Sequence, residues 1–101
     1  MKKLIIQIPA YNEAETLPKV LDDLPRQLEG VESIQIIVID DGSTDNTAQV
    51  ALEHGADFVL RHRNNLGLSK AFISGIQLAL ALGADIIVNT DADHQYPGNE
   101  I

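Results

Sequence analysis

An Asp-x-Asp pair, Asp91 and Asp93, follows an apolar run near the carboxyl end of the chain. The run, residues 86–88, is rich in β-branched side chains, which is typical of a buried parallel strand, so we expect both carboxylates at that strand's carboxyl end. Two carboxylates one residue apart can share a hard cation such as Mg²⁺ or Mn²⁺, which typically completes its shell with substrate phosphates. Taken alone the pair is a weak signal, because acidic residues after a strand also cap helices and solvate loops.

Polar residues also follow the first two apolar runs of the chain, residues 4–8 and 34–39. Asp41 offers a carboxylate that can accept a hydrogen bond from a uracil or guanine N–H, although Asp, Gly and Ser also build ordinary helix-capping turns. Tyr11 either packs against a nucleobase or is a half-buried surface aromatic. Glu13 either binds a ribose hydroxyl or complements the dipole of the helix that follows.

One basic cluster, residues 61–67, follows a third apolar run and contains Arg61 and Arg63, and Lys70 lies just beyond it. Residues 65–71 predict the start of a helix, whose N-terminal amides favour a diphosphate, and one of these cations could assist. The same cations are also ordinary solvated loop charges. His62 and His94 are expected on the surface. Neither is expected to bind zinc, because no second His or Cys lies at ligand spacing.

Four strands are predicted to position these residues: residues 4–8, 34–39, 58–60 and a fourth that begins near residue 85. Pro9 is expected to end the first strand. Three helices between them complete a β-α-β-α-β-α-β order with short connections. We therefore expect an α/β fold, a Rossmann-like parallel sheet with right-handed crossovers and helices on both faces. All four strand-end loops then gather at one edge of the sheet, where ligands bind in such folds.

The three helices are predicted from apolar residues at helical spacing. The first is expected to end or kink at Leu24, before a proline, and its apolar positions are Leu17, Val20, Leu21, Leu24 and Leu28. The second, capped by Ser43 or Thr44, carries Ala48, Val50, Ala51 and Leu52. The third spans about residues 69–82, with Gly75 close to the sheet, and shows on one side Phe72, Ile76, Ala79 and Leu80.

The composition describes one small domain or a piece of a larger one, with 101 residues and 45% hydrophobic content. A net charge of -8 disfavours nonspecific binding to nucleic acid or anionic membranes, so no nucleic-acid partner is expected. The absence of cysteine excludes disulfide scaffolds and cysteine-rich zinc sites. No secretion signal or membrane span is predicted, and a cytoplasmic location is expected. Residues 97–101 look like a turn entering a further helix, so we expect that the chain is part of a longer domain.

Four motifs together are more specific than any one of them: Ile-Pro-Ala-Tyr-Asn-Glu at 8–13, Val-Ile-Asp-Asp-Gly-Ser-Thr-Asp at 38–45, Asn-x-Gly at 65–67 and Asp-Ala-Asp at 91–93. In this order and spacing the chain resembles the family 2 glycosyltransferases, which have the GT-A fold and use nucleotide-diphosphate sugars with a divalent metal. Residues 91–97, Asp-Ala-Asp-His-Gln-Tyr-Pro, are most similar to the polyprenyl-phosphate sugar transferases of the dolichol-phosphate mannosyltransferase type. Phe72 and Ile73 stand where many other members carry Arg-Asn, which disfavours the polysaccharide-forming branches.

The resemblance implies roles for individual residues. The residues that it places around the nucleoside are Pro9, Tyr11, Glu13, Ile39 and Asp41. Lys70, just beyond the basic cluster, is a further substrate-binding candidate. Asp91 and Ala92 would lie beside the ribose and the diphosphate. Asp93, with Gln95, would hold Mg²⁺ or Mn²⁺, and Asp91 is a further candidate ligand, so Asp91 and Asp93 are the candidate catalytic residues.

The resemblance also implies a reaction, in which an acceptor oxygen attacks the anomeric carbon of a UDP- or GDP-linked sugar with inversion. The expected acceptor is a polyprenyl phosphate, which is already ionised, whereas a hydroxyl acceptor would need a base. Residues 1–101 would be the nucleotide-sugar-binding part of a glycosyltransferase domain, truncated after the Asp-x-Asp loop and inactive alone. The full-length protein is expected in the cytoplasm or at the cytoplasmic face of the membrane. Self-association is expected through surface that truncation exposes.

Two other functions stay open at this point. A nucleotidyltransferase also binds nucleotides on an α/β sheet with metal-binding acids, but it usually has a Gly-rich basic loop after its first strand. This chain has Pro-Ala-Tyr-Asn-Glu there, at 9–13. A nucleotide-binding or interaction module could keep the fold without catalysis, and a pure interaction module would show no nucleotide binding at all.

Overall fold

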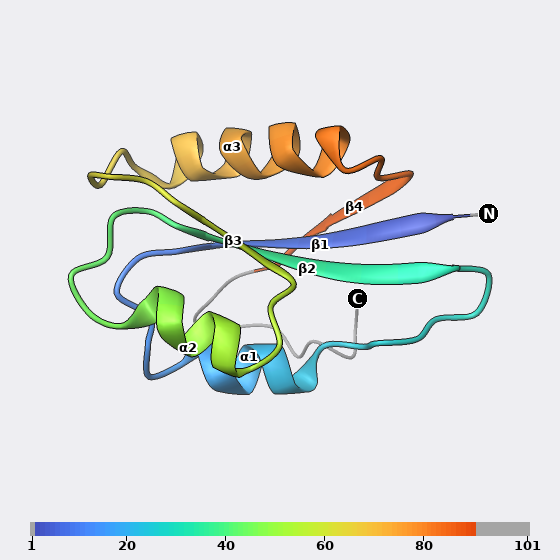
Figure 1. The fold of residues 1–101 in the computed structure, drawn as a ribbon, viewed down its shortest axis with the longest axis horizontal. Helices are drawn as coiled ribbons and strands as arrows, with labels where there is room; N and C mark the ends of the chain where they lie inside the picture. Colours follow the sequence, from blue (N-terminus) through green and yellow to red (C-terminus); the bar gives the residue numbers. More distant parts are fainter. Residues whose placement is uncertain (1, 91–101) are drawn as a thin grey trace.

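The computed structural model describes residues 2–90, in which strands and helices alternate along the chain as predicted (Figure 1). The strands are β1 (Lys3–Ala10), β2 (Ser33–Asp40), β3 (Phe58–Arg61) and β4 (Ile86–Asn89). The helices are α1 (Leu17–Asp23), α2 (Thr47–Glu53) and α3 (Leu68–Ala81). None of these helices is long and apolar enough to cross a membrane.

The strands form one parallel sheet in the order β3-β2-β1-β4, which confirms the predicted α/β class. Figure 1 shows α1 and α2 on one face of the sheet and α3 on the other. The core is divided accordingly: residues such as Ile6 and Leu21 pack on the side of α1 and α2, and residues such as Ile39 and Ala71 pack under α3. Because β1 and β2 are covered on both faces, their sequences are almost continuously apolar.

Strand β1 continues past Pro9, so the prediction that Pro9 ends the strand is wrong. On the β4 side, Gln7 O accepts a hydrogen bond from Thr90 N at 3.1 Å. On the β2 side, Ala10 O accepts one from Asp41 N at 2.8 Å. Since successive residues point their backbone groups to alternate sides, the nitrogen of Pro9 faces the β4 side, and β4 has already ended there. The missing N–H of Pro9 therefore costs no ladder hydrogen bond.

Helix α1 is shorter than its apolar pattern predicts. It ends at Asp23, and Leu24 is already extended with ψ 143°, because a residue before proline avoids the helical region. The predicted end at Leu24 is thus confirmed. Leu28 lies beyond the helix and packs against the core from the segment that follows, so it is not part of the helical face.

The predicted cap of α2 is wrong. The N-cap is Asn46, which makes no side-chain cap hydrogen bond. Ser43 and Thr44 lie upstream of it and bond instead to the loop after β1. Leu52 is 59% exposed, and the buried positions of this seven-residue helix are Thr47, Val50 and Ala51.

Helix α3 contacts the sheet through small residues rather than large ones. Its buried positions are Ala71, Gly75 and Ala79. Phe72 and Leu80, which were predicted on the same side of the helix as Ala79, are 41% and 61% exposed, whereas Ala79 is buried. The close approach explains the difference, because a Cβ on Gly75 would lie 1.5 Å from Gln7 Oε1 and 2.7 Å from Ile39 Cδ1. A helix this close to the sheet leaves no room for large side chains at the contact.

Candidate functional site

The sheet changes its direction of growth at β1. The chain adds β2 and β3 outward on one side of β1 and then returns to place β4 on the other side. In open α/β sheets, ligands bind outside the carboxyl ends of the strands at such a point. The strand register sets Ala10, Asp40 and Arg61 side by side at the ends of β1, β2 and β3. The loops predicted to form the site therefore begin next to one another.

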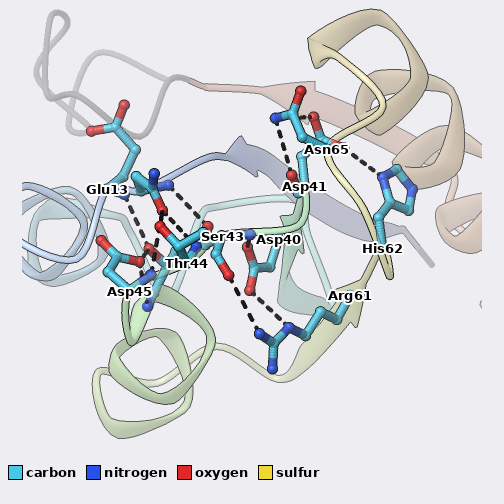
Figure 2. A network of polar contacts seen from close by, with 11 residues as sticks. Glu13, Asp40, Asp41, Ser43, Thr44, Asp45, Arg61, His62 and Asn65 are labelled. Atoms are coloured by element: carbon cyan, nitrogen blue, oxygen red, sulfur yellow. Dashed lines mark hydrogen bonds and ion pairs between the residues drawn. The ribbon is translucent and has the colours of Figure 1, made fainter.

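Asn12 joins the loop after β1 to the loop after β2, whose residues Ser43, Thr44 and Asp45 are labelled in Figure 2. Its Oδ1 accepts hydrogen bonds from Thr44 N at 2.8 Å and from Asp45 N at 3.4 Å. Its backbone N donates to Ser43 Oγ at 2.9 Å. Asn12 has a φ of 52°, the one positive φ of a non-glycine residue in the described chain, and Asn is among the residues that tolerate it best. The two loops are thus one bonded unit.

A second set of hydrogen bonds joins the same two loops through Asp45 and Thr47. Thr47 Oγ1 accepts from Glu13 N at 3.0 Å, and Asp45 Oδ2 accepts from Ala14 N at 3.3 Å. Asp45 Oδ1 accepts from Thr47 N at 3.0 Å and from the Thr47 hydroxyl. Burial raises the pKa of Asp45, but the hydrogen bonds from Thr47 and the Ala14 amide outweigh it and hold the pKa below its ordinary 3.8.

The Asp41 carboxylate is enclosed by the loop that follows β3 (Figure 2), and its side chain is 0% exposed. Its Oδ1 accepts from His62 Nδ1 at 2.7 Å and from Leu66 N at 3.0 Å. Its Oδ2 accepts from Gly67 N at 2.9 Å and from Asn65 Nδ2 at 3.3 Å. Burial raises the pKa of Asp41, but the hydrogen bonds from His62 and from the two backbone amides, together with attraction to His62, hold it below its ordinary 3.8.

These contacts bear on two expectations. Both oxygens of Asp41 accept hydrogen bonds from within the chain, so its role in accepting a nucleobase N–H stays a prediction that requires residues 65–67 to move. The surface position predicted for His62 is wrong, because its side chain is only 11% exposed. Its ring lies between Asp41 and Ser74, with Nε2 at 2.9 Å from Ser74 Oγ.

Arg61 covers the other carboxylate of the pair, Asp40 (Figure 2). Its Nε lies 3.5 Å from Asp40 Oδ2, and its Nη2 donates to Ser43 O at 3.4 Å. Asp40 is fully buried, and its Oδ1 accepts from Ser43 N at 3.0 Å. Of these three cations, Arg61 thus has partners within the site, while Arg63 lies exposed in the loop and Lys70 lies exposed in the first turn of α3.

A groove of about 550 Å³ opens between the carboxyl end of β1 and the first turns of α3. Its lining is mostly apolar and consists of Pro9, Leu68, Ser69, Phe72 and Ile73. Its volume is in the range of pockets that hold small ligands. Because Pro9 also belongs to the predicted nucleoside pocket, the groove adjoins the predicted donor site.

The remaining predicted site residues have different surroundings. Tyr11 is 40% exposed directly after β1. Glu13 lies just before α1, and its Oε2 accepts from the Thr16 hydroxyl at 2.8 Å, which agrees with a role at the start of that helix. Ile39 is fully buried under α3, so its side chain does not reach the surface of the edge. Outside the described residues lie the predictions for Asp91, Ala92, Asp93, His94 and Gln95.

The predicted metal ligands all follow β4. Among residues 2–90, no group of three or more His, Cys, Asp or Glu side chains could hold a metal ion. Strand β4 runs beside β1, and Thr90 N donates to Gln7 O. The described chain therefore reaches the ligand-binding edge immediately before the Asp-x-Asp pair.

Three residues that shape this site were not identified from the sequence: Asn12, His62 and Ser74. A signal existed for Asn12, since an Asn in a short loop between strand and helix is a common choice for a positive φ. No comparable signal existed for His62 and Ser74. Their contact depends on how the loop after β3 turns back onto α3, and apolar periodicity does not report that turn.

Comparisons with known proteins agree with the motifs. A family model described as Glycosyl transferase family 2 matches residues 5–101. The chain is 32% identical over 116 residues to the UDP-N-acetylglucosamine--dolichyl-phosphate N-acetylglucosaminyltransferase of Methanococcus voltae, covering 99% of this chain and 45% of that protein. It is 33% identical over 108 residues to the undecaprenyl-phosphate 4-deoxy-4-formamido-L-arabinose transferase of Proteus mirabilis, covering 100% of this chain and 32% of that protein.

Solved structures give the same assignment. The glucosyl-3-phosphoglycerate synthase of Mycobacterium tuberculosis, crystallised with Mn²⁺, UDP and glucosyl-3-phosphoglycerate, is 29% identical with a TM-score of 0.69, over 90% of this chain and 33% of that chain. Such neighbours are GT-A glycosyltransferases, which confirms the predicted fold. The chain spans less than half the length of the proteins it matches. Because the family model covers nearly all of its residues, the chain belongs to glycosyltransferase family 2, a family of transferase enzymes.

Proposed function

We propose that the loops at the carboxyl edge of the sheet bind the nucleoside diphosphate of a UDP- or GDP-linked sugar, and that the sugar is transferred to a polyprenyl phosphate. The observation that carries the proposal is the bonded pair of loops after β1 and β2, which presents Tyr11 where the sheet changes direction. Loops already held by hydrogen bonds lose little conformational entropy when a ligand binds. Pro9 and the groove beside it extend this surface toward α3.

The names of the similar proteins support the same chemistry. The Methanococcus voltae protein is named for UDP-N-acetylglucosamine and dolichyl phosphate, and the Proteus mirabilis protein for undecaprenyl phosphate. The Mycobacterium tuberculosis enzyme was crystallised with UDP and Mn²⁺. Since this chain covers 45% and 32% of the first two proteins, we assign it the nucleotide-binding part, and the activity of the full-length protein belongs to the proposal.

A divalent metal is part of the proposal. The donor set formed by Asp93, Gln95 and Asp91 consists of oxygen atoms, which Mg²⁺ and Mn²⁺ prefer. A metal bound there would neutralise the charge that develops on the departing nucleoside diphosphate. Lys70, exposed in the first turn of α3, is the cation in the described chain that we propose to assist the diphosphate.

A phosphate acceptor suits an inverting transfer. One phosphate oxygen forms a bond to the anomeric carbon while the bond from that carbon to the nucleoside diphosphate oxygen breaks. The acceptor is already ionised at neutral pH, so this step transfers no proton and needs no base. A lipid phosphate and a nucleotide sugar meet at the cytoplasmic face of the membrane, and we propose that location for the full-length protein.

Calorimetry with UDP and with GDP, each with and without Mn²⁺, tests the donor site on the 101-residue chain. We expect Mn²⁺-dependent binding of one nucleotide, weakened at least about tenfold by Asp93→Asn, as for loss of one charged ligand. Glu29→Gln is the matched control, because it removes the same charge from an exposed residue between α1 and β2, at the opposite edge of the sheet. A folded chain that binds neither nucleotide with Mn²⁺, or equal losses in both variants, would contradict the proposal.

The exposed apolar side of α3 supports a second property, self-association of the chain. Leu68, Ile73 and Leu80 are 61%, 51% and 61% exposed there, and exposed apolar side chains favour contact with a second copy. Sedimentation velocity should show a dimer that Ile73→Ser weakens. Leu52→Ser, on α2 at the other face of the sheet, should leave it unchanged. A wild-type chain that stays monomeric at high concentration would exclude self-association.

A further inference from the structure

Three polar side chains lie in a row behind the predicted donor site. Ser74 Oγ is 2.9 Å from His62 Nε2, and His62 Nδ1 is 2.7 Å from Asp41 Oδ1. The His62 side chain is 11% exposed and that of Asp41 is 0% exposed, so water does not compete freely for these bonds. Ser74 comes from α3, His62 from the loop after β3, and Asp41 from the end of β2.

The direction of the row follows from what each group can donate. An ionised carboxylate only accepts, so His62 Nδ1 carries the proton that it shares with Asp41. In the neutral ring Nε2 is then an acceptor, and the Ser74 hydroxyl donates to it. The Asp41 carboxylate thereby selects the tautomer, Ser74 helps to hold the ring plane, and His62 in turn holds the carboxylate.

The row does not form a hydrolytic site. A serine nucleophile needs backbone amides nearby to stabilise an oxyanion, and these amides must be free. Ser74 lies inside helix α3, where amides are bonded to carbonyl oxygens of the preceding turn. The row is therefore suited to holding a group in place.

The group that it holds organises the loop after β3. Asp41 receives the amides of Leu66 and Gly67, which lead directly into α3 and the groove residues Leu68 and Ser69. The same loop lies so close to β2 that a Cβ on Gly42 would be 2.4 Å from Asn64 C. The position of the carboxylate thus sets the position of the groove wall.

We propose that His62 is a positioning residue of the donor site, which orients Asp41 through its Nδ1–H and thereby fixes residues 65–67 and the start of α3. The functional part rests on the proposed nucleotide binding. The local part, that His62 holds the loop, stands independently of any ligand.

Two substitutions separate the Nδ1 contact from the Nε2 contact. In His62→Asn the side-chain amide occupies the place of Nδ1 and still donates to Asp41. In His62→Gln the amide reaches the place of Nε2, next to Ser74, and the donor to Asp41 is lost. Amide hydrogen exchange at Leu66 and Gly67, followed by NMR, should be about tenfold faster in His62→Gln and close to wild type in His62→Asn, as for loss of one charge-assisted bond.

The ring itself gives a signature that folding alone does not produce. The ¹⁵N shifts of His62 should report the Nδ1–H tautomer in the wild-type chain and also in Ser74→Ala, because that variant keeps the Asp41 acceptor at Nδ1. Unchanged exchange in His62→Gln, equal acceleration in both His62 variants, or an Nε2–H tautomer in the wild type would overturn the proposal.

Calorimetry with UDP or GDP and Mn²⁺ then tests the link to the donor site. We expect affinity about tenfold lower in His62→Gln and within about twofold of wild type in His62→Asn. Equal affinities, despite faster exchange in His62→Gln, would refute the link while keeping the local role. If the wild-type chain binds no nucleotide, the proposed function fails, and the exchange and tautomer measurements still decide the role of His62.

Discussion

Replacing Gly42 with alanine tests how closely the loop after β3 lies against the end of β2. Gly42 has a φ of 75°, which a residue with a Cβ adopts at a cost of about 1–2 kcal/mol. A Cβ there would also lie 2.4 Å from Asn64 C and 2.5 Å from Asn65 N. Both are backbone atoms, so no rotamer change relieves the overlap, and moving the loop costs a further ~1–3 kcal/mol, as in overpacked sites. We therefore expect Gly42→Ala to lower the free energy of unfolding by about 2–5 kcal/mol.

Gly30→Ala is the matched control. Gly30 has a φ of 80°, and a Cβ there would meet nothing within 4 Å, so only the conformational cost of about 1–2 kcal/mol applies. Urea unfolding followed by circular dichroism gives both free energies, provided that the m-values agree. For a domain of this size each kcal/mol also lowers the Tm by roughly 4–8 °C.

Equal destabilisation by the two variants would refute the reasoning, since it would mean that the contact between Gly42 and the backbone of Asn64 and Asn65 costs nothing to disturb. A second readout follows from the position of the loop. Because Gly67 donates to Asp41 from this loop, its amide should exchange faster in Gly42→Ala than in Gly30→Ala.

Three further outcomes are expected. Asn12→Ala should lower the free energy of unfolding by about 2–4 kcal/mol, because alanine adopts the positive φ at a cost and the side-chain acceptor is lost. Asn12→Gly should lower it less, because glycine adopts this φ freely, and urea unfolding measures both. Acid should destabilise the fold, because the pKa values of Asp41 and Asp45 are lower in the folded chain than in the unfolded one. Their contribution to stability is complete above about pH 4 and is lost as the pH falls through the pKa values of the folded chain. Unfolding free energies from pH 6 to pH 2 should show this loss, and a shallower one in Asp45→Asn. Gly75→Ala should lower the free energy of unfolding by about 1–3 kcal/mol despite the helix preference of alanine. Adding Gln7→Ala should recover part of that loss, because Gln7 Oε1 is the nearest atom that the new methyl group meets. A Gly75→Ala chain as stable as wild type in urea would contradict the close packing.

The sequence predicts the strands well and the helix faces poorly, for a physical reason. A parallel strand covered on both sides must be apolar throughout, so β1 and β2 stand out in the sequence. On α3, Ala71 and Phe72 are both apolar, and periodicity does not weigh their sizes. The distance between helix and sheet decides which of them is buried, and only Gly75 indicated that this distance is short.

The carboxylates show a similar limit. An acidic residue before Gly and Ser, such as Asp41, can cap a helix, bind a ligand or anchor a distant loop, and the sequence does not distinguish these three roles. For Asp41 the deciding partners are two backbone amides of residues 66 and 67, which carry no side-chain signature. The family resemblance pointed to the loops of the proposed site, while the hydrogen bonds that hold these loops are seen only in the structure.

The central place of β1 has a consequence for the order in which the molecule assembles. Lys3 N donates to Asp85 Oδ2 at 2.8 Å across 82 positions of sequence, so the two strands that border the switch point are made at nearly opposite ends of the described chain. During synthesis β1 can pair with β2 early, but its other edge waits until β4 arrives, and closing so long a loop is slow. Until then the central strand is an edge strand, open to pairing with another chain. The switch point is thus completed last, and a chain that ends before residue 86 would have one edge of its central strand β1 unprotected.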